Sequence, residues 1–169
     1  LTNSTSEALC RVASLAHIED WRATSLGRWH DPAARLELRQ GSILSRKDLV
    51  HACRDVDAVI HLAGLKSVGE SIKDPLRYWE INVRGSLLLL QVMEEVGCRT
   101  IVFSSSASIY GLQERVPIIE TTAINPINPY ACTKASVERL LSDLASSESG
   151  WRVACLRYFN TVGAHRSEE

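Results

Sequence analysis

Apolar positions in the first third of the chain repeat with the period of a helix in some segments and of a strand in others. The helical spacing predicts a helix over residues 7–16, and the stretch 21–34, which carries a glycine and a proline, predicts a loop. Residues 36–38 alternate between apolar and polar and predict a short strand. Ser45 is a typical helix-capping residue, so we expect a helix over 46–53.

The rest of the chain continues this alternation of strands and helices. The continuous apolar run 58–63 predicts a parallel strand that is covered on both faces. It is followed by a predicted helix over 75–95, a strand over 100–104, a helix over 129–145 and a strand over 151–157. This order predicts an α/β fold, a partial Rossmann-type doubly wound parallel sheet with flanking helices.

Three segments lie at the carboxyl ends of predicted strands, and these ends share one edge of the sheet. Gly64, residues 104–106 and residues 158–160 each come at or just after the carboxyl end of a strand. Ligands of open α/β sheets bind at that edge. The sequence therefore predicts one crevice that these segments share, and the turn-rich stretch 111–126 is expected to lie over it as a lid.

Ser106, Tyr130 and Lys134 form a set of side chains suited to proton transfer. Tyr130 and Lys134 are four residues apart in the predicted helix, so they share one face. A free phenol is a poor base near neutrality, and a nearby ammonium favours the phenolate. Ser106, placed on a loop after a strand, is positioned to share the proton of a substrate hydroxyl through a short hydrogen bond. Each residue alone also fits a plain structural role.

Composition narrows the class of protein. The chain has 169 residues, 45% hydrophobic residues and a formal net charge of −1. We therefore expect a protein with a sizeable core, no basic surface for nucleic acid, no membrane segment and no secretory signal. The five cysteines lack metal-binding spacing, which favours reduced thiols in a cytoplasmic protein and no metal site. His61 is expected to be a buried core histidine.

Four stretches of the sequence resemble the UDP-glucose 4-epimerase family of extended short-chain dehydrogenases/reductases. They include His61-Leu-Ala-Gly-Leu-Lys-Ser-Val-Gly-Glu-Ser71 and Leu156-Arg-Tyr-Phe-Asn-Thr-Val-Gly-Ala-His165, and also residues 103–111 and 128–134. The resemblance covers nearly all of the chain from Leu36 onward. It implies a bound NAD, a UDP-hexose substrate, hydride transfer at carbon 4 of the hexose through a 4-keto sugar, and a homodimer.

The resemblance also assigns roles to residues. Tyr130 would be the acid and base, Lys134 would favour its phenolate and bind the nicotinamide ribose, and Ser106 would polarise the 4-hydroxyl. The residues assigned to the cofactor are Thr2, Asn3, Ser4, Ser42, Ile43, Leu62, Ala63, Gly64, Lys66, Asn82, Tyr130, Lys134 and Phe159. Those assigned to the substrate are Lys66, Ser106, Tyr130 and Asn160. From the residues alone, Lys66 also fits a solvated lysine, and Asn82 a bond to its own helix.

Some positions differ from the family pattern. Ser42 stands where the family has an aspartate that receives the adenine amino group, so a charge-assisted hydrogen bond is weakened. The chain also lacks the Gly-rich turn of a dinucleotide-binding unit and a substrate domain after the last strand. We therefore expect residues 1–169 to be an incomplete NAD-binding Rossmann domain, inactive in isolation, from a longer enzyme.

Two alternatives remain open at this point. A related sugar-nucleotide dehydratase, decarboxylase or uronate epimerase shares the fold. Dehydratases of the superfamily typically place Asp-Glu after the residue at this serine position, whereas Ala107 and Ser108 follow Ser106, which disfavours a dehydratase. The other alternative is a non-catalytic remnant that keeps the sheet and does not hold NAD.

Overall fold

The computed structural model describes residues 7–18, 21–24, 36–147 and 150–161 and divides them between two compact units. The first unit covers residues 1–42 and 162–169. It contains α1 (Glu7–Leu15) and two parallel strands, β1 (Trp21–Thr24) and β2 (Leu36–Arg39). The loop prediction for residues 21–34 is wrong at its start, because Trp21–Thr24 pairs with β2. Pairing with a strand further along the chain is not visible in local spacing.

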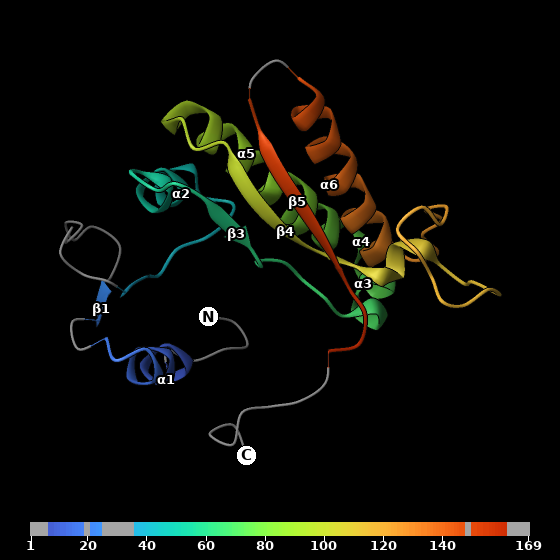
Figure 1. Cartoon of the computed structure of the whole chain (residues 1–169), viewed down its shortest axis with the longest axis horizontal. Coiled ribbons are helices and arrows are strands. Elements are labelled where there is room, and N and C mark those ends of the chain that lie inside the picture. The colour runs from blue at the N-terminus through green and yellow to red at the C-terminus, as the bar shows by residue number, and fades with distance from the viewer. Residues whose placement is uncertain (1–6, 19–20, 25–35, 148–149, 162–169) are drawn as a thin grey trace. The chain divides into compact units, whose positions relative to one another are not determined.

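The second unit, Ile43–Thr161, carries the predicted Rossmann-type core (Figure 1). Its parallel strands lie in the order β3 (Val59–His61), β4 (Thr100–Ser106) and β5 (Arg152–Tyr158). His61 is in register with Phe103, and Ser106 with Tyr158. The carboxyl ends of the strands therefore lie at one edge of the sheet, as predicted.

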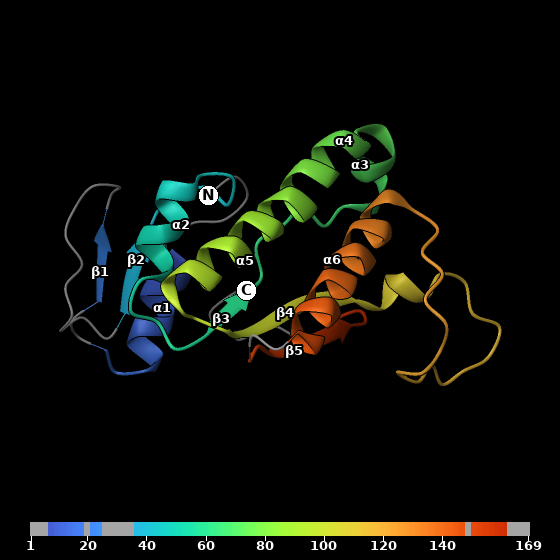
Figure 2. The ribbon, with the colours of Figure 1, turned by 90° about the horizontal axis from the view of Figure 1, so that it is seen from above.

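The helices of the second unit lie on one face of this sheet (Figures 1 and 2). They are α2 (Arg46–Cys53), α3 (Val68–Lys73), α4 (Pro75–Tyr78), α5 (Gly85–Val96) and α6 (Pro129–Ser146), with η1 (Trp79–Arg84) joining α4 to α5 and η2 (Ala107–Tyr110) following β4. The core between sheet and helices includes Phe103, Met93 and Leu141. Ser45 caps α2 by accepting from the Asp48 backbone N–H, as predicted.

The long helix predicted over 75–95 contains a π-helical segment, Trp79–Arg84, between α4 and α5. Apolar residues keep their helical spacing on both sides of this segment, so the pattern does not reveal it. Gly97, with φ of 81°, ends α5 in the left-handed conformation that glycine adopts without strain. Single π turns inside helices are often found at functional sites.

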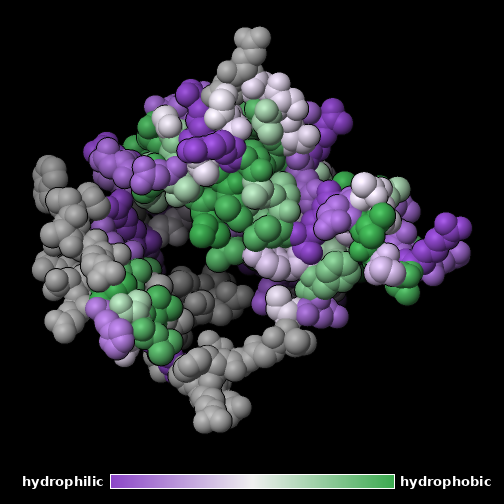
Figure 3. Space-filling model, viewed as in Figure 1, coloured by the Kyte–Doolittle hydropathy of each residue, from purple (hydrophilic) through white to green (hydrophobic). Residues whose placement is uncertain are grey.

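The other face of the sheet is open to solvent within the second unit, which contradicts the expectation of cover on both faces. Ile60 is 69% exposed, and Leu156 and Tyr158 also remain exposed there. Apolar side chains form a continuous patch over these strands in Figure 3. No helix among the described residues is long and apolar enough to cross a membrane.

Candidate functional site

Tyr130 and Lys134 lie in the first two turns of α6. Asn128 caps this helix by accepting from the Ala131 backbone N–H at 2.9 Å, and Pro129 occupies its first turn. Tyr130 is half-buried, whereas Lys134 is only 6% exposed. The local sequence thus fixes where the helix begins, and the helix places both side chains toward the end of β4.

Lys134 is a buried cation that contacts a backbone carbonyl and an aromatic ring. Its Nζ donates to the Ser104 carbonyl at 2.8 Å and lies 4.8 Å from the centroid of the Phe103 ring. The Tyr130 ring centroid is 5.9 Å from the same nitrogen. Burial lowers the pKa of Lys134 to about 8. The geometry therefore places a titratable ammonium beside the phenol ring.

Ser106 ends β4 and caps η2, where a loop was expected. Its Oγ accepts from the Ser108 backbone N–H at 3.2 Å and from the Ser108 hydroxyl at 2.9 Å. Because both of these contacts are accepted, the hydrogen of the Ser106 hydroxyl is left to donate to another group. Sequence reasoning missed Ser108, although serine two residues after a strand end is typical of such turns.

Asn82 fastens the loop after β3 to the helix that carries Tyr130. Its Oδ1 accepts from the Leu65 N–H at 2.8 Å, and its Nδ2 donates to the Leu65 carbonyl at 3.0 Å and to Thr133 Oγ1 at 3.1 Å. Thr133 in turn donates to the Tyr130 carbonyl at 2.7 Å. Both amide hydrogens of Asn82 are therefore used within the protein, so Asn82 supports this loop and does not merely bond its own helix. Sequence reasoning missed Thr133.

Gly64 brings the backbone of this loop close to Lys134. Its φ is 154°, and a Cβ at this position would lie 3.0 Å from Asn82 Oδ1 and 3.9 Å from Lys134 Nζ. A side chain would thus crowd the polar groups that face the strand ends. The bare backbone at Gly64 leaves an approach to the ammonium for a ligand.

The other predicted site residues lie outside the group of contacts formed around Ser106, Lys134 and Asn82. Leu62, Ala63, Lys66, Phe159 and Asn160 are exposed on segments that follow β3 and β5. Ile43 packs against the core with its side chain over Gly85. Ser42 ends the first unit, and the segment Thr2, Asn3 and Ser4 lies outside the described residues. Among the described residues, no group of acidic, histidine and cysteine side chains is arranged to hold a metal ion.

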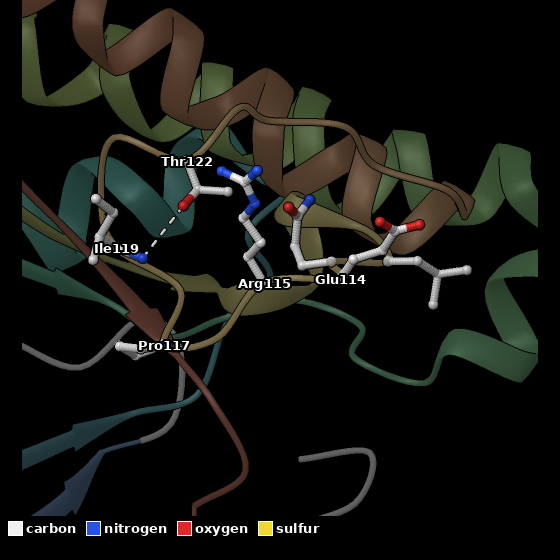
Figure 4. A pocket seen from close by; sticks show the side chains of 7 residues that line it. Glu114, Arg115, Pro117, Ile119 and Thr122 are labelled. Carbon is white, nitrogen blue, oxygen red and sulfur yellow. Dashed lines mark hydrogen bonds between the residues drawn. The ribbon is translucent and has the colours of Figure 1, made fainter.

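The loop between η2 and α6 forms a hollow of its own (Figure 4). The residues lining it are Leu112, Gln113, Glu114, Arg115, Pro117, Ile119 and Thr122. The Ile119 N–H donates to Thr122 Oγ1 at 3.3 Å across this loop. Ser106, Tyr130 and Lys134 do not line the hollow, so it is separate from the site at the strand ends.

His61 is a satisfied core histidine, as predicted. It is 4% exposed, and its Nε2 lies 2.8 Å from Ser86 Oγ. Ser86 donates its own hydrogen to the Asn82 carbonyl at 2.5 Å, so Nε2 is the donor in the contact with His61. Burial, and then the charge of Lys134, lowers the pKa of His61 to about 4. His61 is therefore neutral at physiological pH.

This burial predicts a loss of stability in acid. Unfolded protein protonates His61 with a pKa near 6.5, whereas the folded protein does so only near 4. The unfolded state thus binds more protons between these values, and the free energy of unfolding should fall by about 3 kcal/mol as the pH drops through this window. Urea denaturation of the full-length protein at pH 7 and pH 4 measures the change.

Two variants isolate the contribution of this histidine. His61→Gln should lose most of the difference between the two pH values, because glutamine does not titrate. His51→Gln makes the same substitution at an exposed position of α2 and should keep the wild-type difference. An equal pH dependence in His61→Gln and the wild type would contradict the assignment.

The chain is similar to known epimerases. The model of a family described as "NAD dependent epimerase/dehydratase family" matches residues 7–169. The UDP-glucose 4-epimerase of Bacillus subtilis is 41% identical over 169 residues, which is 99% of this chain and 45% of the relative. UDP-glucose 4-epimerase 3 of Oryza sativa is 42% identical over 98% of this chain and 42% of its own length. The chain thus spans less than half the length of these relatives.

The chain is also similar to solved structures of epimerases. The UDP-glucose-4-epimerase of Stenotrophomonas maltophila, with bound NAD and formylated UDP-arabinopyranose, superposes with a TM-score of 0.83 at 38% identity over 99% of this chain and 46% of that one. The enzyme of Bifidobacterium longum, in complex with NAD+ and UDP, gives a TM-score of 0.80 at 35% identity over 97% of this chain and 45% of that one. The Rossmann-type fold is thereby confirmed.

Proposed function

Because the chain belongs to the NAD dependent epimerase/dehydratase family, we propose that it is the catalytic-centre portion of a UDP-glucose 4-epimerase. The full-length protein would interconvert UDP-glucose and UDP-galactose. The observation that carries this proposal is the buried ammonium of Lys134 beside Tyr130, at the end of the strand that carries Ser106. Relatives named as this enzyme, at 41% and 42% identity, support the choice of substrate.

NAD is the cofactor that fits these residues. Lys134 would bind its nicotinamide ribose, the open backbone at Gly64 and the exposed residues Leu62, Ala63 and Lys66 would line it, and Phe159 would lie near its ring. When bound, NAD supplies reversible hydride acceptance at carbon 4 of the sugar. The two solved structures compared above contain it. The adenosine half would contact Thr2, Asn3, Ser4, Ser42 and Ile43.

The protein's own groups would move the proton. Tyr130 Oη would take the proton of the 4-hydroxyl as the ketone forms, and would later return it to the reduced sugar oxygen. Ser106, whose Oγ already accepts two hydrogen bonds, donates its hydrogen to the same sugar oxygen. Lys134 would place its positive charge beside the Tyr130 ring. Lys66 and Asn160 would hold the sugar nucleotide.

An assay of the purified full-length protein distinguishes the candidate functions. UDP-galactose is supplied without added NAD, and the products are separated by chromatography. UDP-glucose supports the epimerase, and a 4-keto-6-deoxy sugar nucleotide would indicate a dehydratase instead. No product, together with no NAD released on denaturation, would favour a non-catalytic remnant.

We expect no turnover by the 169 residues alone. The open sheet face around Ile60 and Leu156 and the unpaired outer edges of β3 and β5 within the second unit leave the core incomplete. The chain also spans only 45% of the Bacillus subtilis relative. Measurable epimerisation by this chain would overturn that expectation.

A homodimer in the cytoplasm is the proposed state of the full-length protein. The apolar side chains of Ile72, Leu76, Trp79 and Leu87 remain exposed on α3, α4, η1 and α5. Exposed apolar patches mark protein interfaces. All five cysteines are free thiols, which fits a reducing compartment.

Ser108 offers a mild test of how Ser106 is oriented. Ser108→Ala removes the hydroxyl donor and leaves the backbone N–H in place. One hydrogen bond of this kind contributes about 1 kcal/mol, so kcat of the epimerase should fall by up to about tenfold. Steady-state kinetics measures the effect, and Ser146→Ala, an exposed serine at the end of α6, is the control expected to keep full activity.

A further inference from the structure

Arg157 on β5 connects three segments that no sequence pattern joins. Its Nε and Nη2 donate to the Glu138 carboxylate, with contacts of 2.8–3.2 Å. Its Nη1 donates to Tyr110 Oη at 2.6 Å and to the Glu120 carbonyl at 3.0 Å. Every nitrogen of the guanidinium is therefore engaged, two of them in the forked pairing with a carboxylate that arginine allows.

This network is buried at Glu138 and Tyr110 and half-buried at Arg157. The Glu138 and Arg157 side chains are 7% and 22% exposed, and Tyr110 is 2% exposed. The hydrogen bonds that Arg157 donates to Glu138 raise the pKa of the guanidinium, so Arg157 is charged. Because desolvating two charges is costly, a buried pair is weak evidence for stability alone. The pairing of two guanidinium nitrogens with one carboxylate instead fixes the position of β5 relative to α6 at this point.

Two partners of Arg157, Glu138 and Tyr110, are close along the chain to residues of the proposed catalytic set. Glu138 follows Lys134 by one helical turn on the same face of α6. Tyr110 ends η2, the turn that Ser106 caps. The carbonyl of Glu120 belongs to the loop that follows η2, so the same guanidinium also anchors that loop.

We propose, resting on the function proposed above, that Glu138 and Arg157 are positioning residues that hold the turn beginning at Ser106 against the face of α6 carrying Tyr130 and Lys134. Neither side chain belongs to the proposed catalytic set. The pair sets the separation of two segments that must act on one hydroxyl oxygen. Misplacement of a reacting group by about 1 Å lowers rates by up to about 10²-fold.

The test uses variants of the full-length protein. Glu138→Gln keeps the shape and removes the charge, and Arg157→Lys keeps the charge and removes the fork. Both should lower kcat by about 10–100-fold with KM within about twofold of wild type. Asp143→Asn breaks the exposed Arg139–Asp143 pair on the same helix and should leave both constants unchanged.

A gentler variant covers the case in which the charge changes prevent folding. Tyr110→Phe removes only the hydroxyl that accepts from Arg157 and keeps the ring. It should lower kcat by about three- to tenfold at full occupancy of bound NAD. A wild-type kcat in Tyr110→Phe, or in Arg157→Lys, would overturn the inference.

Crystal structures of the wild type and Arg157→Lys test the inference without activity. We expect η2 and Ser106 to move relative to α6 by more than about 0.5 Å, the tolerance of a catalytic constellation. An unmoved Ser106 would overturn the positioning role even if the enzyme is an epimerase. Failure of the wild type to epimerise would remove the proposed function, and these structures would still decide the positioning role.

Discussion

Replacing Tyr130 with phenylalanine in the full-length protein is expected to lower kcat by about 10²–10⁴-fold, the range that general acid and base catalysis contributes. The ring would remain beside Lys134, whose Nζ lies 5.9 Å from its centroid, so packing is preserved. Only the oxygen that exchanges the substrate proton is removed. NAD should stay bound, because the substitution leaves unchanged Lys134 and the Gly64 loop, where we propose that it binds.

The measurement compares kcat with the NAD released on denaturation of each variant. Tyr78→Phe is the matched control, since Tyr78 is a buried tyrosine of α4 whose hydroxyl donates to Glu70 at 3.4 Å. It should keep kcat within about twofold of wild type. Retained turnover in Tyr130→Phe would remove Tyr130 from its role.

Lys134→Met should lower kcat by about 10²-fold or more and should also change how activity depends on pH. Burial gives Lys134 a pKa of about 8, so its ammonium is present below that value and is lost as the pH rises through it. Wild-type kcat should therefore fall above about pH 8. The variant should lack this decline, because methionine carries no charge at any pH.

The pH dependence of the free energy of unfolding tests the burial of Lys134 independently of activity. The unfolded lysine titrates near 10.5, so between about pH 8 and 10.5 the unfolded state binds more protons and the free energy of unfolding rises with pH. The shift corresponds to about 3 kcal/mol, and Lys134→Met should lack this rise. Urea denaturation across the window measures it. Lys73→Met, at an exposed position of α3, is the control, and a wild-type profile in Lys134→Met would contradict the burial of this charge.

Local chemistry made part of the fold predictable. Ser45 and Asn128 are capping residues, and the helices begin directly after them. Tyr130 and Lys134 share a face because they are four residues apart. The convergence of Gly64 and Ser106 at one edge followed from the topology of parallel strands.

The features that escaped prediction depend on contacts between distant segments. Asn82, in the π segment, accepts a hydrogen bond from Leu65, which lies 17 residues earlier in the chain. The strand that begins at Trp21 is defined by its pairing with β2. Glu138 and Arg157 are 19 residues apart, on a helix and a strand. The sequence around each residue does not predict this pairing, because charged residues are mostly exposed to solvent and a buried partner in a distant segment cannot be seen from local spacing.

If Ser106, Tyr130 and Lys134 act in an epimerase, the hydrogen removed from carbon 4 of the sugar returns to the same carbon. The most direct measurement supplies the full-length protein with UDP-galactose deuterated at carbon 4, without added NAD, and follows the label by NMR. We expect UDP-glucose with deuterium retained at carbon 4 and none in the solvent. Product that has lost the label to water, or no product from protein that contains NAD, would contradict the account.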